Sequence, residues 1–200
     1  MAKGENTRSE ILSKALSIAS KVGLEGLSIG GLAKAVGLSK SGLFAHFNSL
    51  ERLQIEVLKT CQDRFIETVI LPALRKPRGE PRIRALADNM LAWEKAVFLP
   101  GGCLFVSAAN EFDDRPGPVR DFLVNSQKDC MAMIATAAKI AIEAEHFSPD
   151  LDTEQFAYEF YSIVLSYHHY ARLLGDPSAE NRYHRAINSL IERSRIENSR

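Results

Sequence analysis

Two short helical patterns joined by a glycine-containing turn, within residues 28–47, constrain this chain more than any other feature. The first pattern carries its apolar residues on one face, at Ile29, Leu32, Ala33 and Val36. Gly37 then allows a left-handed turn at no steric cost, and the small residues Ala33 and Gly37, four apart, would let the two helices cross closely. Ser39 can cap the second pattern, whose apolar residues are Leu43, Phe44 and Phe47. The segment predicts either an ordinary αα-hairpin or a helix-turn-helix, whose second helix enters a DNA major groove.

The composition is that of a soluble globular protein. Hydrophobic residues make up 46% and charged residues 25% of 200 residues, enough for one or two compact domains. There is no long apolar run for a transmembrane helix and no apolar signal core at the N-terminus. Cys61, Cys103 and Cys130 are odd in number and widely spaced, which argues against a disulfide framework or a Cys-rich zinc site. These features predict a cytoplasmic protein without a membrane partner.

The charges are unevenly distributed, although the formal net charge is zero. Residues 1–60 contain eight Lys and Arg against five Asp and Glu, a net charge of +3. The other 140 residues contain 17 against 20, a net charge of −3. The basic excess therefore lies in the segment with the two short helical patterns, which favours binding to nucleic acid.

Apolar spacings of three to four residues, without sustained alternation, predict an all-α protein of about nine helices. Thr7 and Glu10 predict a capping box at the start of the first helix, over residues 8–22. After the hairpin we expect helices over about residues 49–75, 82–98, 103–111, 119–145, 153–175 and 178–195.

Residues 7–60 resemble the DNA-binding domain of the TetR/AcrR family of bacterial regulators. The similarity is most specific over Gly37–Phe47, which reads Gly-Leu-Ser-Lys-Ser-Gly-Leu-Phe-Ala-His-Phe, and it continues over Asn48–Leu53. The rest of the chain is similar to the family only in helix number and length. The resemblance implies a three-helix DNA-binding domain over residues 1–50 and a connecting helix over about 49–75. A ligand-binding and dimerisation bundle would then occupy residues 51–200.

The resemblance also assigns DNA contacts. The implied DNA-binding residues are Thr7, Arg8, Ser28, Ser39, Lys40, Ser41, Gly42, Phe44 and His46. Ser28 and His46 would bind phosphate, whereas Lys40 would reach a guanine edge or a phosphate. Phe44 stands where the family often has Tyr, and Leu50 where it often has Lys. Gly30 and Gly31 also replace an Arg and an acid, so we expect few phosphate contacts and a shallow salt dependence.

The C-terminal residues divide between a dimer interface and a pocket. By the resemblance, the last two helices would dimerise through Phe156, Phe160, Ile163, Val164, Tyr167, Ile187, Leu190 and Ile191. These spacings fit an intramolecular core equally well. A pocket for a mostly apolar small-molecule effector would be lined by Met90, Trp93, Val97, Phe105, Phe122, Met131, Ile134, Tyr161 and His168. Cys103, at a helix start, could sense redox conditions or be an ordinary buried cysteine.

Enzymatic chemistry has little support in the sequence. Glu143 and His146 form a single Glu-x-x-His, whereas a di-iron bundle needs two, and His168 and His169 point to different helix faces. There is no nucleophile elbow, phosphate loop or dinucleotide fingerprint, so we expect no enzyme, metal or cofactor.

The sequence thus predicts a ligand-responsive transcriptional repressor that binds a palindromic operator in double-stranded DNA as a homodimer. The connecting helix would transmit the effector signal. The alternatives are an all-α enzyme or small-molecule carrier with a structural hairpin, and a regulator controlled by a protein partner or by thiol oxidation.

Overall fold

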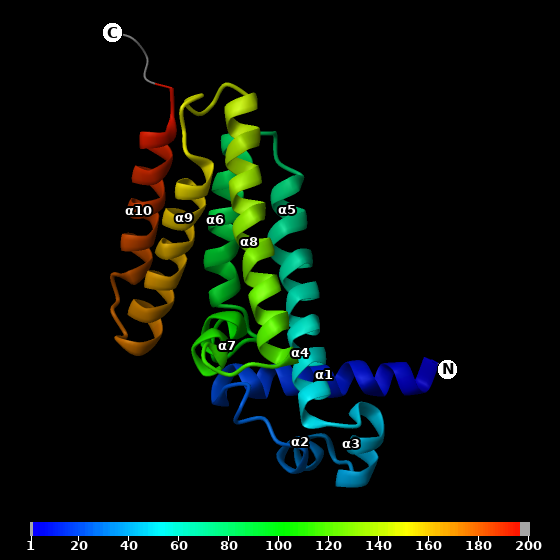
Figure 1. The fold of residues 1–200 in the computed structure, drawn as a ribbon. Helices are drawn as coiled ribbons and strands as arrows, with labels where there is room; N and C mark the ends of the chain where they lie inside the picture. The colour runs from blue at the N-terminus through cyan, green and yellow to red at the C-terminus, as the bar shows by residue number, and fades with distance from the viewer. Residues whose placement is uncertain (1, 197–200) are drawn as a thin grey trace. The chain divides into compact units, whose positions relative to one another are not determined.

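The computed structural model describes the backbone of residues 2–196 and the side chains of residues 7–196. Nine continuous helices make up this part of the chain, two of them containing a π-helical segment, and this confirms the all-α class (Figure 1). The elements are α1 (Ala2–Val22), α2 (Ile29–Val36), α3 (Lys40–Phe47), α4 (Leu50–Phe65), the π-helical η1 (Ile66–Ile70), α5 (Leu71–Leu74), α6 (Glu80–Glu94), α7 (Leu104–Phe112), α8 (Pro118–Glu143), α9 (Thr153–His168), the π-helical η2 (His169–Leu173) and α10 (Ala179–Ser194). No helix in this described part is long and apolar enough to cross a membrane.

The chain packs into two compact units. The first contains Met1–Phe65 and Lys95–Ser126, and the second contains Ile66–Glu94 and Gln127–Arg200. Helix α7 and the start of α8 therefore pack with the N-terminal helices, although about 40 residues of sequence separate them from α4. The domain boundary expected at residue 50 stays a prediction, because these units are defined by packing and not by independent folding.

Local signals in the sequence place the hairpin formed by α2 and α3. The Oγ atom of Ser28 accepts the Gly31 N–H at 3.1 Å, and that of Ser39 accepts the Gly42 N–H at 3.0 Å. Gly37 ends α2 with φ at 71°, as predicted. A Cβ atom on Gly37 would meet nothing within 4 Å, so this glycine is needed for its backbone conformation and not for close helix crossing.

Helix α1 begins earlier than predicted. Thr7 lies inside the helix, because its first residue is Ala2, and the predicted capping box of Thr7 and Glu10 is therefore wrong. The end is as expected, since Gly23 adopts φ of 82° directly after Val22. The spacing of apolar residues predicts six buried side chains on this helix, and five of them are buried: Ile11, Leu12, Ala15, Leu16 and Ala19. The sixth, Ile18, is only partly buried.

The expected long helix after the hairpin is present but not uniform. Ser49 caps it by accepting the Arg52 N–H at 3.1 Å. It then changes from α4 to the π-helical η1 before α5, which has Pro72 in its first turn. Proline has no N–H and its ring collides with the carbonyl four residues earlier, so the wider π turn upstream accommodates Pro72 without breaking the helix.

Aromatic and aliphatic side chains fill the second unit. The rings of Phe147 and Phe156 lie 5.5 Å apart, and those of Phe156 and Phe160 lie 6.1 Å apart. The Tyr183 hydroxyl donates to the Ala87 carbonyl at 2.8 Å, which satisfies a polar group inside the core. Helices α9 and α10 lie side by side in this unit (Figure 1).

Most of the residues predicted to form a dimer interface contribute to the core of a single chain. Seven of the eight are buried within their own chain, namely Phe156, Phe160, Val164, Tyr167, Ile187, Leu190 and Ile191. Side chains already covered in one chain present almost no surface to a second copy. Their helical spacing thus agrees with the intramolecular core, and of the eight only Ile163 is partly exposed. Their part in a dimer interface stays a prediction.

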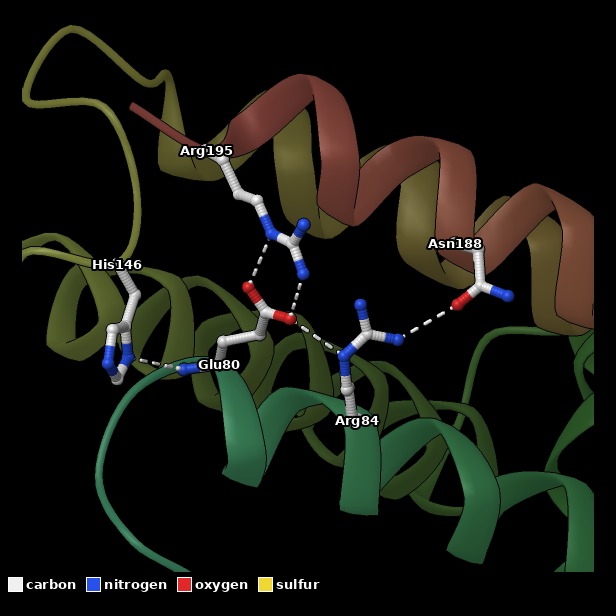
Figure 2. A network of polar contacts seen from close by, with 5 residues as sticks. All are labelled: Glu80, Arg84, His146, Asn188 and Arg195. Carbon is white, nitrogen blue, oxygen red and sulfur yellow. Dashed lines mark hydrogen bonds and ion pairs between the residues drawn. The ribbon is translucent and has the colours of Figure 1, made fainter. Parts of the chain in front are cut away.

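A polar network ties the start of α6 to the end of α10 (Figure 2). Arg195 donates to Glu80 from Nε at 2.9 Å and from a terminal nitrogen at 2.7 Å, and Arg84 donates to Glu80 at 2.7 Å. Arg84 also donates to Asn188 at 2.8 Å. His146 Nδ1 accepts the Glu80 N–H at 3.1 Å, so the lone Glu-x-x-His histidine caps α6. Hydrogen bonds from Arg195, and then from Arg84, lower the pKa of Glu80 to about 2 despite partial burial.

We expect Glu80→Gln to lower the free energy of unfolding at pH 7 by about 1–2 kcal/mol, allowing for the solvent screening of half-exposed Arg195. The pKa of Glu80 is depressed in the folded chain, so its contribution is full above pH 4.5 and is lost as pH falls toward about 2. Denaturant unfolding from pH 7 to pH 3 should therefore show the difference between the two proteins shrinking below pH 4.5.

Glu143→Gln serves as the control, because Glu143 forms one 3.3 Å pair with Arg78 and its side chain is 54% exposed. Glu143→Gln should change the free energy of unfolding by less than about 0.5 kcal/mol. If the free energies of unfolding of wild type and Glu80→Gln differed by the same amount at every pH, the stabilising role of the ionised Glu80 carboxylate would be contradicted.

Candidate nucleic-acid interface

Helix α3 presents one polar and aromatic face to solvent. Lys40, Ser41 and Phe44 are exposed and are neighbours on the helix surface at spacings of three and four residues. Leu43 and Phe47 are buried on the other side. The sequence pattern placed Phe44 on the inner apolar face, but its side chain is 51% exposed. The exposed face is therefore wider and more apolar than the pattern alone suggests.

The two glycines near the start of α2 accommodate neighbouring side chains. A Cβ atom on Gly30 would lie 3.0 Å from Cε of Lys40, so the aliphatic stem of Lys40 lies along α2. A Cβ atom on Gly31 would lie 2.9 Å from Oγ of Ser28, the capping atom of this helix. Lys40 makes no ion pair with any residue that the structure describes, so its ammonium group is available to an anion.

The starts of α2 and α3 are suited to phosphate oxygens. Ser28 and Ser39 are exposed, and each hydroxyl has one cap bond to its own helix. Backbone N–H groups in the first turn of a helix lack intrahelical partners, and the helix dipole favours negative charge there. The structure thus brings seven of the predicted DNA-binding residues together on this hairpin: Ser28, Ser39, Lys40, Ser41, Gly42, Phe44 and His46.

The other two predicted DNA-binding residues, Thr7 and Arg8, lie on α1. The Arg8 guanidinium is 2.9 Å from a Glu56 carboxylate oxygen and 5.2 Å from the centre of the Phe47 ring. Partial burial would raise the pKa of Glu56, but hydrogen bonds from Arg8 and Lys59 lower it. Arg8 therefore joins α1, α3 and α4 within the unit, a role that its sequence position did not indicate.

The nine residues predicted to line an effector pocket divide between the units. Val97, Phe105 and Phe122 belong to the first unit, and Val97 is 96% exposed on a turn. The remaining six belong to the second unit: Met90, Trp93, Met131, Ile134, Tyr161 and His168.

Two of these six residues make polar contacts inside the second unit. The Tyr161 hydroxyl donates to Gln127 at 2.6 Å, and His168 Nδ1 lies 2.8 Å from the buried carboxylate of Glu94. A groove of about 310 Å³ between α9 and α10 includes none of the nine predicted lining residues.

The described residues can also be compared with the requirements of metal and thiol chemistry. No group of three or more His, Cys, Asp and Glu able to hold a metal ion occurs among the described residues. Burial raises the pKa of the Cys130 thiol to about 12, which disfavours the reactive thiolate. Cys103 is buried at the position preceding α7.

Sequence reasoning missed two side chains that hold the corner between α1 and α2. Glu111 on α7 accepts the N–H groups of Leu24 and Glu25, and Gln54 on α4 donates to the Leu24 carbonyl. Glu111 is 87 residues from Leu24, so no local pattern could connect them.

Comparison with protein families and solved structures gives a consistent result. The family model "Bacterial regulatory proteins, tetR family" matches residues 11–57, and "Tetracyclin repressor-like, C-terminal domain" matches residues 79–187. A search of curated proteins found no match.

Solved structures of TetR-family regulators share the fold. A TetR transcriptional regulator from Chloroflexus aurantiacus has a TM-score of 0.85 and 23% identity, covering 96% of each chain. A TetR-family regulator from Cytophaga hutchinsonii has a TM-score of 0.87 and 18% identity, covering 99% of each chain. AibR, in complex with isovaleryl coenzyme A and operator DNA, has a TM-score of 0.73 and 20% identity, covering 92% of this chain and 98% of its own.

The N-terminal match contains the helix-turn-helix, and the C-terminal match alone spans more than half of the 200 residues. The chain therefore belongs to the TetR family of bacterial regulatory proteins and is a DNA-binding transcriptional regulator.

Proposed function

We propose that this regulator is a ligand-responsive repressor that binds a palindromic operator as a homodimer. The observation that carries the proposal is the exposed face of Lys40, Ser41 and Phe44 on a helix whose start is capped and whose opposite side is buried. Such a helix can enter a major groove without rearranging the rest of the hairpin.

In this proposal the residues of the hairpin have distinct roles. Lys40 binds a guanine edge or a phosphate, Ser41 contacts a base, and exposed Phe44 packs against a thymine methyl group or the sugar backbone. Ser28 and His46 bind phosphates on either side. Occupation of promoter DNA by this face would block transcription.

Exposed apolar side chains on α9 and η2 support dimerisation through the last two helices. Tyr158, Leu165 and Leu173 are 68%, 40% and 74% exposed, at spacings of seven and eight residues along nearly the same helix face. The groove between α9 and α10 lies beside this row of exposed apolar side chains. An exposed apolar surface on a single chain favours a protein partner, and a twofold dimer would match a palindromic operator.

The effector would bind in the second unit. Buried Met90, Trp93 and Ile134 provide apolar surroundings, and Tyr161 and His168 add polar groups. This lining favours a mostly apolar small molecule with a few hydrogen-bonding atoms. AibR, in complex with isovaleryl coenzyme A and operator DNA, is a precedent for a small-molecule ligand on this fold, although only the acyl group of that ligand is apolar. The effector would release the operator by binding more tightly to a conformation whose recognition helices no longer fit the groove spacing.

We expect Lys40→Ala to weaken binding to the operator roughly 5- to 150-fold, the range for a lost base contact. The operator is first obtained with wild-type protein from the DNA upstream of its own gene and by selection from a random pool. If Lys40 binds phosphate, the slope of log affinity against log salt should fall by about one.

Lys139→Ala on α8 removes the same charge from an exposed position in the second unit, and it should bind the operator like wild type. Equal operator affinity of Lys40→Ala and wild type would contradict the role of Lys40. If wild-type protein showed no salt-dependent binding to any sequence, the hairpin would be only structural.

We expect Leu165→Glu to produce monomers at micromolar concentration, because a buried unpaired carboxylate at the interface is unfavourable. Analytical ultracentrifugation measures the association state. Val97→Glu is the matched control, because Val97 is exposed and apolar but lies in the first unit, and it should remain dimeric. A dimeric Leu165→Glu variant would place the interface elsewhere.

We expect an apolar small molecule that raises the melting temperature of the protein to lower operator affinity by about tenfold or more, within the usual range of allosteric coupling. The screen uses uncharged apolar compounds, with isovaleryl coenzyme A beside them as a ligand whose acyl group is apolar but whose carrier is charged. Met131→Trp should abolish the thermal shift produced by any such molecule while leaving operator affinity intact. A bound molecule that leaves operator affinity unchanged would contradict ligand-responsive repression.

A further inference from the structure

The corner between α1 and α2 is held by a carboxylate from a distant part of the chain. Glu111 on α7 accepts the Leu24 N–H at 3.1 Å with Oε1 and the Glu25 N–H at 2.7 Å with Oε2. Both oxygens of one carboxylate therefore bind successive N–H groups directly after the end of α1. A charged acceptor makes these bonds stronger than ordinary backbone hydrogen bonds.

The backbone of the corner is shaped for this carboxylate. Gly23 has φ of 82°, and a Cβ atom added to it would lie 2.7 Å from Oε1 of Glu111. Only glycine both adopts this conformation readily and leaves space for the carboxylate. Burial raises the pKa of Glu111, with an opposing effect from the Leu24 N–H, so the site imposes a desolvation cost on the charge.

Leu24 is fixed from its other side as well. The buried Gln54 side chain on α4 donates to the Leu24 carbonyl at 3.0 Å, and the Leu24 side chain is fully buried. Both backbone polar groups of Leu24 are therefore bound by side chains from two other helices. The start of α2 follows four residues later at the cap residue Ser28, so this corner sets where α2 begins.

Helix α7 is itself attached to the end of α1 at a second point. The Gly101 N–H donates to the Ser20 hydroxyl at 3.2 Å. A Cβ atom on Gly101 would lie 1.4 Å from the Ser20 carbonyl oxygen, so the two backbones are in close contact. The segment before α7 and the last turn of α7 therefore both hold the end of α1, within the same compact unit.

We propose that Glu111 is a positioning residue for DNA recognition: it fixes the α1–α2 corner and thereby the angle at which α2 presents the recognition helix α3. The carboxylate lies outside the helix-turn-helix and touches no DNA-binding residue, yet specific operator affinity depends on it. This inference rests on the proposed operator binding.

The test compares Glu111→Gln with Glu25→Gln in the full-length protein. Each substitution removes one negative charge. The Glu25 side chain is exposed and pairs with Arg115, so replacing it leaves the hydrogen bonds to Glu111 intact. Three quantities are measured: affinity for the selected operator, affinity for random-sequence DNA, and hydrogen exchange of the Leu24 and Glu25 amides.

For Glu111→Gln we expect operator affinity to fall by about tenfold or more and exchange of both amides to rise by a similar factor. Affinity for random DNA should stay equal or increase slightly because of the added charge. Glu25→Gln should retain operator affinity and slow exchange at Leu24. Glu111→Asp, whose side chain is one methylene shorter, should have an operator affinity and amide exchange rates between those of wild type and Glu111→Gln. If Glu111→Gln does not fold, Glu111→Asp is compared with wild type instead.

The possible failures are distinct. A wild-type protein that binds no DNA specifically would overturn the proposed function. A wild-type protein that binds its operator, with Glu111→Gln and Glu111→Asp binding equally well, would overturn the role of Glu111 alone. Faster amide exchange without loss of operator affinity would also overturn it, because Glu111 would then be only a structural cap.

Discussion

The two helices that would read DNA are too short to hold their own shape. Helices α2 and α3 have eight residues each, and isolated helices below about 12 residues are marginal in water. Their position therefore depends on the buried contacts of Leu32, Leu43 and Phe47 and on groups that bind the backbone where the hairpin begins. The corner at Leu24 is one such constraint, because both of its backbone polar groups are bound by side chains from other helices.

What could be predicted from the sequence is what is encoded within a few residues. Gly37 ends α2, and Ser39 caps α3 by accepting the Gly42 N–H at 3.0 Å. Each of these helix caps involves residues only two to four positions apart, so the residues that form it can be recognised within one short stretch of sequence. The helix-turn-helix and most helix extents followed from such signals together with apolar spacing, whereas the start of α1 did not.

Apolar spacing alone does not say what covers a helix face, and this is where the sequence predictions diverged from the structure. Phe156 and Ile187 have the spacing of an interface but are buried in their own chain, whereas Phe44 has core spacing but is half exposed. Glu111 gave no signal at all, because an acidic residue near a helix end is ordinary and its partners are 86 and 87 residues away. Such contacts depend on tertiary packing, which one sequence does not display.

The place of α7 in the first unit bears on how an effector would act. The long helix of α4, η1 and α5 was the expected route for a signal, but the chain also returns to the first unit over Lys95–Ser126 and leaves it again. This segment carries Phe105, a predicted pocket residue, and Glu111 on the same helix. A hydrogen bond to a charged group contributes about 1.5–3 kcal/mol, and a typical allosteric coupling free energy is about 1–3 kcal/mol. Loss of the Glu111 contacts through a displacement of α7 would therefore involve a free energy of the same size as a typical allosteric coupling.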